Sequence, residues 1–304
     1  MNYEEENILV EEPKKKKEPK LAKRTKKLNR STGGTVALFI FLALIAAAMG
    51  MPMVMTIMNA LKPLDEIFLF PPRIIVRNPT FSNFSDLMIL MQQSWVPFSR
   101  YVLNSFIFVG FGTLGHLLVA SLAAYPLAKN KFPGAAILFS MVVLALMFTG
   151  DVTAIPNFLI ITALGINNTY LAIILPAFSG ALGLYLMRQF MEQVPDSLVE
   201  SARLDGANEF YIWGKIIMPN VKPAWLTLII LQFQIMWGGT GGIFIRSEQL
   251  RPLPFALSML GGGGVYRAGV AAAVGLIMMI VPVTFFILSQ AQMIETMATS
   301  GMKD

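Results

Sequence analysis

The sequence predicts an all-α membrane protein with six transmembrane helices, from its composition and from the length of its apolar segments. Of the 304 residues, 55% are hydrophobic and 14% are charged, whereas about 25% of the residues of a soluble domain are charged. Each apolar segment can form a helix that crosses a hydrocarbon layer about 30 Å thick. The segments are continuously apolar rather than alternating, which favours helices over membrane strands. They lie at residues 35–60, 101–128, 135–162, 168–189, 224–245 and 268–291.

The chain begins with a polar segment, residues 1–34, whose charges come in blocks. The acidic run Glu4–Glu6 precedes the basic run Lys14–Lys17. The segment has too little apolar surface to offset the entropy of ordering it. We expect a disordered basic tail in the cytoplasm that fixes the orientation of the chain. A contact of this tail with lipid headgroups or with a partner is the alternative.

The first apolar segment is too long for the core of a signal peptide, and five more apolar segments follow it. We therefore expect an uncleaved helix. Together with an outer loop it makes up a first part of the chain, residues 35–96. The other five helices form a core over residues 97–293, and residues 294–304 form a C-terminal tail.

The distribution of Lys and Arg residues sets the expected orientation. With the N-terminus in the cytoplasm, the basic tail and the short loop that holds Lys129 and Lys131 lie inside, as the positive-inside rule requires. The connection over residues 150–167 has no Lys or Arg and then lies outside. We predict a multi-pass protein of the plasma membrane with both termini in the cytoplasm.

Two ionisable residues within apolar segments are candidates for function. Asp151, with Pro156, interrupts the third segment, so we expect that helix to break or end early. Asp151 could cap a helix at the membrane interface or line a path for a solute. His116 lies in the middle of the second segment, where an ionisable group is a functional candidate. A neutral imidazole that is hydrogen-bonded to a neighbouring helix is the simpler interpretation.

Gln232, Gln234 and Trp237 lie on the fifth apolar segment and are further candidates for a solute path. Amide groups and an indole ring suit a sugar site, because they offer polar edges and an aromatic face. Hydrogen bonds between helices explain the two glutamines about equally well.

The polar stretch between the fourth and fifth segments predicts two short helices joined by a bend. Ser197 and Glu200 have the spacing of a capping box, so the first helix should begin at residue 197 or 198. Gly206 should stop or bend it, because glycine is unfavourable inside a helix and adopts the left-handed conformation at its end. A second helix should cover 207–217, and Pro219 and Pro223 should end it before the next apolar segment begins.

This elbow could lie on the membrane surface as an amphipathic element. Its charges are mixed rather than basic, however. Aromatic side chains beside alanine and glycine, such as Phe210 near Ala207, suit insertion into a cleft of another protein.

The stretch over residues 190–222 resembles the EAA signature of the permease subunits of ABC importers. That signature reads Glu-Ala-Ala, three residues, Gly, and then a spaced hydrophobic residue and a proline; Ser201 departs from its second position. Flanking runs such as Met187–Phe190 and Ala124–Ala128 look like the carbohydrate-importing, maltose-type branch, and the resemblance covers residues 55–304. The matching positions are Glu200, Ala202, Asp205, Gly206, Ala207, Phe210, Ile216 and Pro219.

The resemblance implies an ABC type I importer permease fold with a cytoplasmic coupling elbow. Two related permease subunits would form the path, and a pair of ATPase subunits would dock beneath them. An extracellular solute-binding protein would deliver a sugar or oligosaccharide. Glu200 would pair with a basic residue of an ATPase cleft, Gly206 would set the bend, and Phe210 would fill the apolar part of the cleft. The glycine-rich loop 238–267 would be a flexible connection or reach into the binding protein.

The sequence argues against chemistry within the chain itself. Cysteine is absent and His116 is the single histidine, so a His- or Cys-based metal cluster cannot form. Gly214 and Lys215 lack the other residues of a phosphate loop, so ATP hydrolysis is expected in a separate subunit. No catalytic residue, metal or cofactor is expected. The basic residues do not form a folded face for nucleic acid, so no nucleic-acid partner is expected. Membrane lipid is expected to surround the apolar helices.

Two other functions remain open. A permease for a non-sugar solute would share this architecture, and a strongly charged set of path-lining residues would favour it. An ion-coupled secondary transporter usually buries ionisable residues near the midplane, and His116 is the single such group in these segments.

Overall fold

The computed structural model of the chain describes residues 32–148 and 150–300. Within those residues it consists of helices and loops, with no strand, which confirms the all-α class. The chain divides into two compact units, Met1–Met51 and Pro52–Asp304. The predicted basic tail falls almost entirely outside the described residues.

Helix α1 (Thr32–Leu61) begins in the first unit, whose described part is its Thr32–Met51 portion, and ends in the second unit. Its residues from Gly33 to Leu61 are long and apolar enough to span a membrane, in agreement with the predicted segment at 35–60. The side chains of residues 33–49 are exposed, which is the surface expected of a helix that faces lipid.

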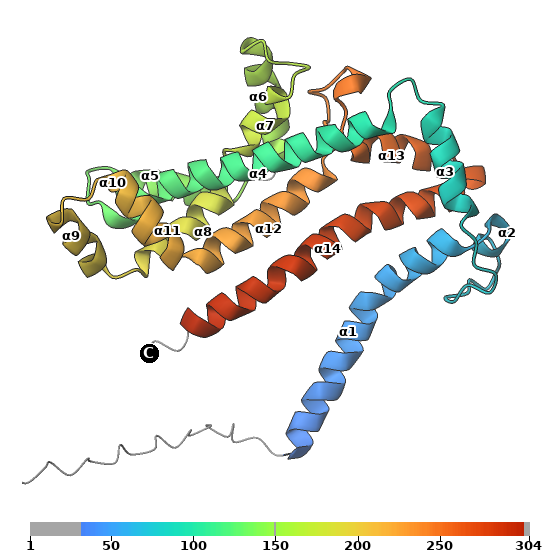
Figure 1. Ribbon diagram of the computed structural model, residues 1–304, viewed down its shortest axis with the longest axis horizontal. Coiled ribbons are helices and arrows are strands. Elements are labelled where there is room, and N and C mark those ends of the chain that lie inside the picture. The colour runs from blue at the N-terminus through green and yellow to red at the C-terminus, as the bar shows by residue number, and fades with distance from the viewer. Residues whose placement is uncertain (1–31, 149, 301–304) are drawn as a thin grey trace, which may run out of the picture. The chain divides into compact units, whose positions relative to one another are not determined.

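The second unit is built around helix α4 (Phe98–Lys129), which runs along its length (Figure 1). Helix α14 (Ala268–Ser300) packs against α12 and α13. It continues past the predicted boundary at residue 293. The helices that pack on α4 are α7 (Leu171–Ala177), α8 (Ala181–Glu192), α12 (Lys222–Gly238) and α13 (Leu253–Gly261).

Two clusters of buried apolar side chains lie at opposite ends of α4. We call the end with the polar stretch the elbow end, and the end near Phe98 the far end. The elbow-end cluster includes Tyr125, Met187, Met191, Val199, Ala202, Ile212 and Ile217. The far-end cluster includes Leu87, Met91, Tyr101, Val109, Trp237, Leu257 and Val270.

The segment between α1 and α4 is ordered by buried polar side chains. It holds α2 (Leu64–Ile67) and α3 (Ser82–Gln92). Asn83 donates to the carbonyl oxygens of Ala60 and Lys62 at 2.9 and 2.8 Å. Glu66 accepts from the backbone N–H of Arg77 at 2.9 Å. Since buried polar groups need such partners, these bonds fix α2 and α3 at the end of α1.

The third apolar segment is two helices, α5 (Ala135–Ala145) and α6 (Gly150–Ala163). The predicted interruption is confirmed, but its position was wrong. The break lies before Asp151, and Pro156 lies inside α6. Proline removes one backbone donor, and helices of membrane proteins tolerate that loss when neighbouring groups compensate.

The fourth apolar segment contains a break that the sequence did not predict, between α7 and α8. Two polar side chains from other helices bind the carbonyl groups that the break frees. The Nδ1 atom of His116 on α4 lies 3.2 Å from the carbonyl oxygen of Phe178. Gln232 on α12 donates to the carbonyl oxygen of Ala177 at 3.4 Å. The break is therefore satisfied within the protein, as membrane depth requires.

The fifth predicted helix is shorter than expected, since α12 ends at Gly238 rather than at residue 245. Glycines follow, and Gly241 and Gly242 have φ angles of 82° and 49°. A helix cannot continue through that left-handed conformation.

Four helical segments of the described residues are long and apolar enough to span a membrane. A fifth is formed by Glu209–Asn220 and Lys222–Gly238 together, which are bent by 84°. Helices α5 and α6 are each shorter than a span, so six crossings stay a prediction. The segments that qualify alone are Gly33–Leu61, Phe98–Lys129, Leu171–Glu192 and Val265–Gln290.

Candidate functional site: the elbow from Asp196 to Asn220

The elbow begins with α9 (Asp196–Leu204), whose first residue differs from the prediction. Pro195 is the N-cap, and Asp196 is the first helical residue, so Ser197 lies inside the helix and the predicted capping box is wrong. The carboxylate of Asp196 accepts a hydrogen bond from Nζ of Lys129 at 2.7 Å. This bond lowers the pKa of Asp196. An acidic residue in the first turn also suits the helix dipole.

Gly206 forms the bend, as predicted. Its φ angle is 81°, which is the left-handed conformation that favours glycine. Its N–H donates to the carbonyl of Arg203 at 3.1 Å, and the N–H of Ala207 donates to the carbonyl of Ala202 at 3.0 Å. This pair of bonds is a Schellman motif. It ends α9 and redirects the chain.

The second part of the elbow is a continuous helical segment with an irregular middle. The structure places its start at Glu209, after an N-cap at Asn208 whose side chain accepts from the N–H of Tyr211 at 2.7 Å. Helix α10 (Glu209–Tyr211) passes into the π-helix η1 (Ile212–Ile217) and then α11 (Met218–Asn220).

The segment ends at Asn220, between Pro219 and Pro223 and a few residues beyond the predicted end at residue 217. Pro219 lies in α11, inside this continuous segment, where it lacks the N–H of a helical hydrogen bond. The chain turns at Val221, and α12 begins at Lys222.

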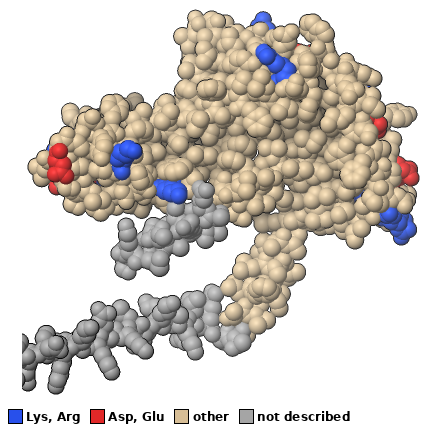
Figure 2. Space-filling view, viewed as in Figure 1, with Lys and Arg blue, Asp and Glu red and all other residues tan. Residues whose placement is uncertain are grey.

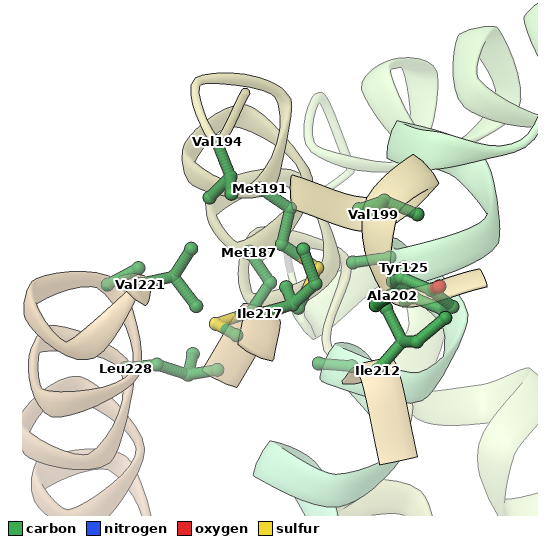
Figure 3. Packing of buried hydrophobic residues seen from close by; sticks show 13 residues of the cluster. Tyr125, Met187, Met191, Val194, Val199, Ala202, Ile212, Ile217, Val221 and Leu228 are labelled. Atoms are coloured by element: carbon green, nitrogen blue, oxygen red, sulfur yellow. The ribbon is translucent and has the colours of Figure 1, made fainter. Parts of the chain in front are cut away.

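One face of the elbow is buried against the rest of the second unit. Val199 and Ala202 of α9 and Ile212 and Ile217 of η1 pack with Tyr125 of α4 in the elbow-end cluster. Figure 3 shows these side chains pointing toward one another, together with Met187 and Met191 of α8. Burying a large aliphatic side chain contributes about 1.5–3 kcal/mol. The elbow is therefore held rigidly on this face.

Polar bonds connect the elbow to α4 beside this cluster. Nε of Arg203 donates to Glu209 at 2.9 Å across the bend, and the hydroxyl of Tyr125 donates to Glu209 at 2.6 Å. Arg203 also donates to the side-chain oxygen of Asn130 at 2.8 Å. The bond to Glu209 raises the pKa of Arg203. Nζ of Lys129, whose side chain is 2% exposed, binds the carbonyl of Val194 as well as Asp196.

The sequence analysis did not single out Glu209, Arg203 or Tyr125 as paired residues. Arg203 and Glu209 lie six positions apart on either side of Gly206. They are opposite charges that the predicted bend would bring together, and that was the available signal. The partner Tyr125 is remote in the sequence, and nothing in the pattern indicates it.

Away from this cluster, the elbow exposes three large apolar or aromatic side chains among polar ones. Leu204 is 89% exposed, Phe210 is 75% exposed and Tyr211 is 55% exposed. Glu200 is also exposed, and no side-chain hydrogen bond or ion pair is found for it within the described residues. On the face seen in Figure 2, charged side chains gather toward the ends and edges of the second unit, and its broad middle has none.

The structure describes the side chains of three of the four predicted solute-path residues. Gln232 binds the break after α7, and the indole N–H of Trp237 donates to the carbonyl of Met278 on α14 at 3.2 Å. Both therefore have internal partners. Gln234 is exposed. Asp151 lies in α6, and its side chain falls outside the described residues.

The loop over residues 239–252, at the far end, is ordered by side chains of α4 and by Asn168. Nδ2 of Asn104 donates to the carbonyl oxygens of Gln249 and Arg251 at 2.9 and 2.8 Å. The side-chain oxygen of Asn168 accepts the N–H groups of Arg246 and Ser247 at 2.9 and 2.7 Å. This part of the predicted glycine-rich loop is thus held in place by hydrogen bonds.

Three comparisons with known proteins agree with this architecture. Residues 32–297 match the family model described as "Binding-protein-dependent transport system inner membrane component". The arabinooligosaccharides transport system permease protein AraQ of Bacillus subtilis is 27% identical over 272 residues, which covers 88% of this chain and 95% of that protein. The sn-glycerol-3-phosphate transport system permease protein UgpE of Pectobacterium atrosepticum is 29% identical over 57% of this chain and 62% of that protein.

The solved structures show a related fold. A chain of a bacterial ABC transporter involved in the import of the acidic polysaccharide alginate superposes with a TM-score of 0.73 at 20% identity, covering 86% of this chain and 98% of that one. A chain of the alginate transporter in complex with a periplasmic protein bound to an alginate pentasaccharide gives a TM-score of 0.58 at 16% identity. At these identities the likeness concerns the fold alone.

Proposed function

The chain belongs to the family of binding-protein-dependent transport system inner membrane components, and from this premise we propose that it carries a sugar or oligosaccharide into the cell as one permease of an ABC importer. The match covers residues 32–297, which is most of the chain. Its partners are a second permease, an ATPase pair and a solute-binding protein. It is a transport subunit, and ATP is hydrolysed in the separate ATPase.

The observation that carries the proposal is the two-faced elbow. Its inner face is fixed to the helical bundle, while Leu204, Phe210 and Tyr211 present an exposed apolar surface. Apolar anchors at the centre of an interface supply most of its binding energy. We infer that this surface enters a cleft of the ATPase and that Glu200 pairs there with a basic residue. Gly206 keeps the surface at the correct angle to α4.

The names of the relatives support the class of solute. AraQ is named for arabinooligosaccharides, and both alginate structures concern a polysaccharide. Of the predicted path residues, Gln234 has a free amide face in the structure and is the best candidate for a solute contact. Asp151 stays a candidate, whereas Gln232 and Trp237 act first by holding α7 and α14.

A phosphorylated polyol is the second candidate solute, since UgpE relatives are named for sn-glycerol-3-phosphate. A screen of the associated binding protein against neutral oligosaccharides and glycerol phosphates separates the two. Tight binding of the phosphate ester alone would replace the sugar proposal.

The elbow side of the membrane is the cytoplasm in this proposal. The basic N-terminal residues and Lys129 and Lys131 then lie on the same side as the ATPase. The far end, with the 239–252 loop, faces the binding protein.

Affinity purification from membranes in mild detergent tests the proposal. The chain should bring down a second permease and an ATPase in a ratio near one to one to two. Leu204→Glu should lose the ATPase but keep the second permease, and Tyr266→Glu is the control because Tyr266 is 90% exposed at the far end. A homo-oligomer without ATPase would contradict the proposal and favour an ion-coupled transporter.

A further inference from the structure

Helix α4 connects the elbow to the 239–252 loop as one helix, with Pro126 in its last turn. Its 32 residues span about 48 Å at 1.5 Å per residue. Several neighbouring segments are broken: α7 and α8 are separate helices, as are α5 and α6, and α12 is bent by 84° from the elbow segment. Figure 1 shows α4 extending from α10 and α9 at one end to α13 and α3 at the other.

At the elbow end, α4 is bound to both arms of the elbow. Lys129 binds Asp196 at the start of α9, and Tyr125 binds Glu209 at the start of α10. Asn130, directly after α4, accepts from Arg203. Movement of either arm must therefore move the end of α4 or break these bonds.

At the far end, the first two turns of α4 bind the loop repeatedly. Tyr101 donates from its hydroxyl to Glu248 at 2.7 Å, and Nε of Arg100 donates to the carbonyl of Gln249 at 3.2 Å. Asn104 binds two loop carbonyls, and the hydroxyl of Ser105 accepts the N–H of Leu253 at 2.8 Å. Asn104 is fully buried, so these bonds are protected from water.

The middle of α4 is packed too tightly to bend easily. A Cβ atom on Gly112 would lie 2.7 Å from the Cε atom of Met236 on α12. A Cβ atom on Gly115 would lie 1.9 Å from the ring of Phe178 at the break after α7. His116 binds the same break. Close-packed interiors transmit displacement rather than absorb it.

We propose that α4 is the element that transmits movement of the elbow to the 239–252 loop, with Tyr125 and Tyr101 as matched positioning residues at its two ends. This rests on the proposed docking of the elbow on an ATPase. The ATPase then shifts both arms of the elbow, α4 follows as a rigid body, and the loop follows α4. In this form of coupling, the ATPase changes the relative populations of two positions of one packed helix, α4.

The two tyrosines make the inference testable with minimal substitutions. Both are buried or nearly so, and each donates its hydroxyl to a glutamate. Tyr→Phe removes one oxygen and keeps the ring in its cluster. Tyr185→Phe is the control, since Tyr185 stacks on Phe139 through its ring and no hydroxyl partner is found for it among the described residues.

The experiment places a reporter on the loop and the perturbation on the elbow. The chain has no cysteine, so Ile243→Cys, at a position that is 60% exposed, carries one spin label in this subunit. Spin label on cysteines of the partner subunits gives a background signal. This signal is measured in a transporter that contains the cysteine-free parent chain, and it is subtracted. In the purified transporter, Mg-ATP with vanadate should change the mobility of the label. Tyr125→Phe should reduce that change about fivefold, the lower end of typical coupling effects, with the ATPase still bound.

A double substitution sharpens the test. Tyr101→Phe should give a similar loss, and the double variant should be no worse than the more affected single variant if both act through α4. Three results would each overturn the inference. The label in Tyr125→Phe could respond to nucleotide as fully as in the parent, or the losses in the two single variants could multiply in the double variant. The label in the parent could also fail to respond to nucleotide. Failure of the proposed function is distinguishable, because then no ATPase accompanies the parent chain at all.

Discussion

The two ends of α4 are held by different kinds of hydrogen bond. At the elbow end most bonds join polar side chains to each other, as in Lys129–Asp196 and Tyr125–Glu209. At the far end most bonds join side chains to the backbone of the loop, as in Asn104 with Gln249 and Arg251. The elbow therefore depends on the identity of its own side chains. The loop depends mainly on Asn104 and Asn168, and of its own side chains Glu248 and Arg251 form hydrogen bonds.

Gly206→Val should have the largest effect. Nothing lies within 4 Å of a Cβ atom at Gly206, so the cost comes from its φ angle of 81° alone, about 1–3 kcal/mol of strain. The arms of the elbow should change their angle, and transport in vesicles should be lost while the chain still inserts. Gly214→Val is the control, since Gly214 has equal space and no positive φ angle. Normal uptake by a well-expressed Gly206→Val variant would contradict the role of the bend.

Asn104→Leu should have the next largest effect, at the far end. The substitution leaves two loop carbonyls and the hydroxyl of Tyr170 without their partner, and each unsatisfied buried group costs about 1–3 kcal/mol. The melting temperature in detergent should fall clearly, and the loop should become sensitive to protease. Asn220→Leu is the control, because Asn220 is exposed and binds only its own turn. Equal melting temperatures for the two variants would contradict the expectation that a buried amide stabilises the protein more than an exposed one.

Glu209→Gln should have a smaller effect that depends on salt. The Arg203 and Glu209 side chains are 39% and 50% exposed, so their ion pair contributes about 0.5–1 kcal/mol at most. The melting temperature should fall slightly at low salt. The difference from the parent should shrink in 1 M salt, where the Debye length falls to about 3 Å. Glu200→Gln should leave the isolated chain unchanged, and a salt-independent loss at Glu209 would show that packing rather than charge is responsible.

Arg246→Ala should have almost no effect, although Arg246 lies in the loop that Asn168 fixes. The bond uses its backbone N–H, which alanine retains. Asn168→Ala should destabilise the loop, both because the acceptor for Arg246 and Ser247 is lost and because Asn168 has a φ angle of 61°, which asparagine tolerates better than alanine. Protease digestion of the two variants compares them directly. If the protease cleaved both variants equally, the side chain of Arg246 would stabilise the loop as much as the hydrogen bonds to the loop backbone do.

The sequence was sufficient for features set by local chemistry. Apolar length placed the helical segments, and Gly206 placed the bend, because a helix needs a special residue where it turns. Helix ends were less accurate. Ser197 and Glu200 fit a capping box by spacing, but Pro195 and Asp196 start the helix one residue earlier, with Lys129 binding Asp196.

Features that depend on tertiary partners were not accessible from the sequence. The break at Phe178 is stabilised by His116 and Gln232, which come from two other helices. Read alone, Gln232 and Trp237 suggested a sugar site, whereas in the structure their polar groups bind a helix break and the backbone of α14. Polar residues in apolar helices have both uses, and only the position of a neighbour distinguishes them.

The most direct test of the account is a photo-cross-link from the exposed face of the elbow. A benzophenone amino acid at Phe210, which is 75% exposed, should form a cross-link to the ATPase subunit in the purified transporter. The same group at Tyr266 should not. Cross-links from position 210 only to lipid or to a permease would contradict the docking of the elbow on an ATPase.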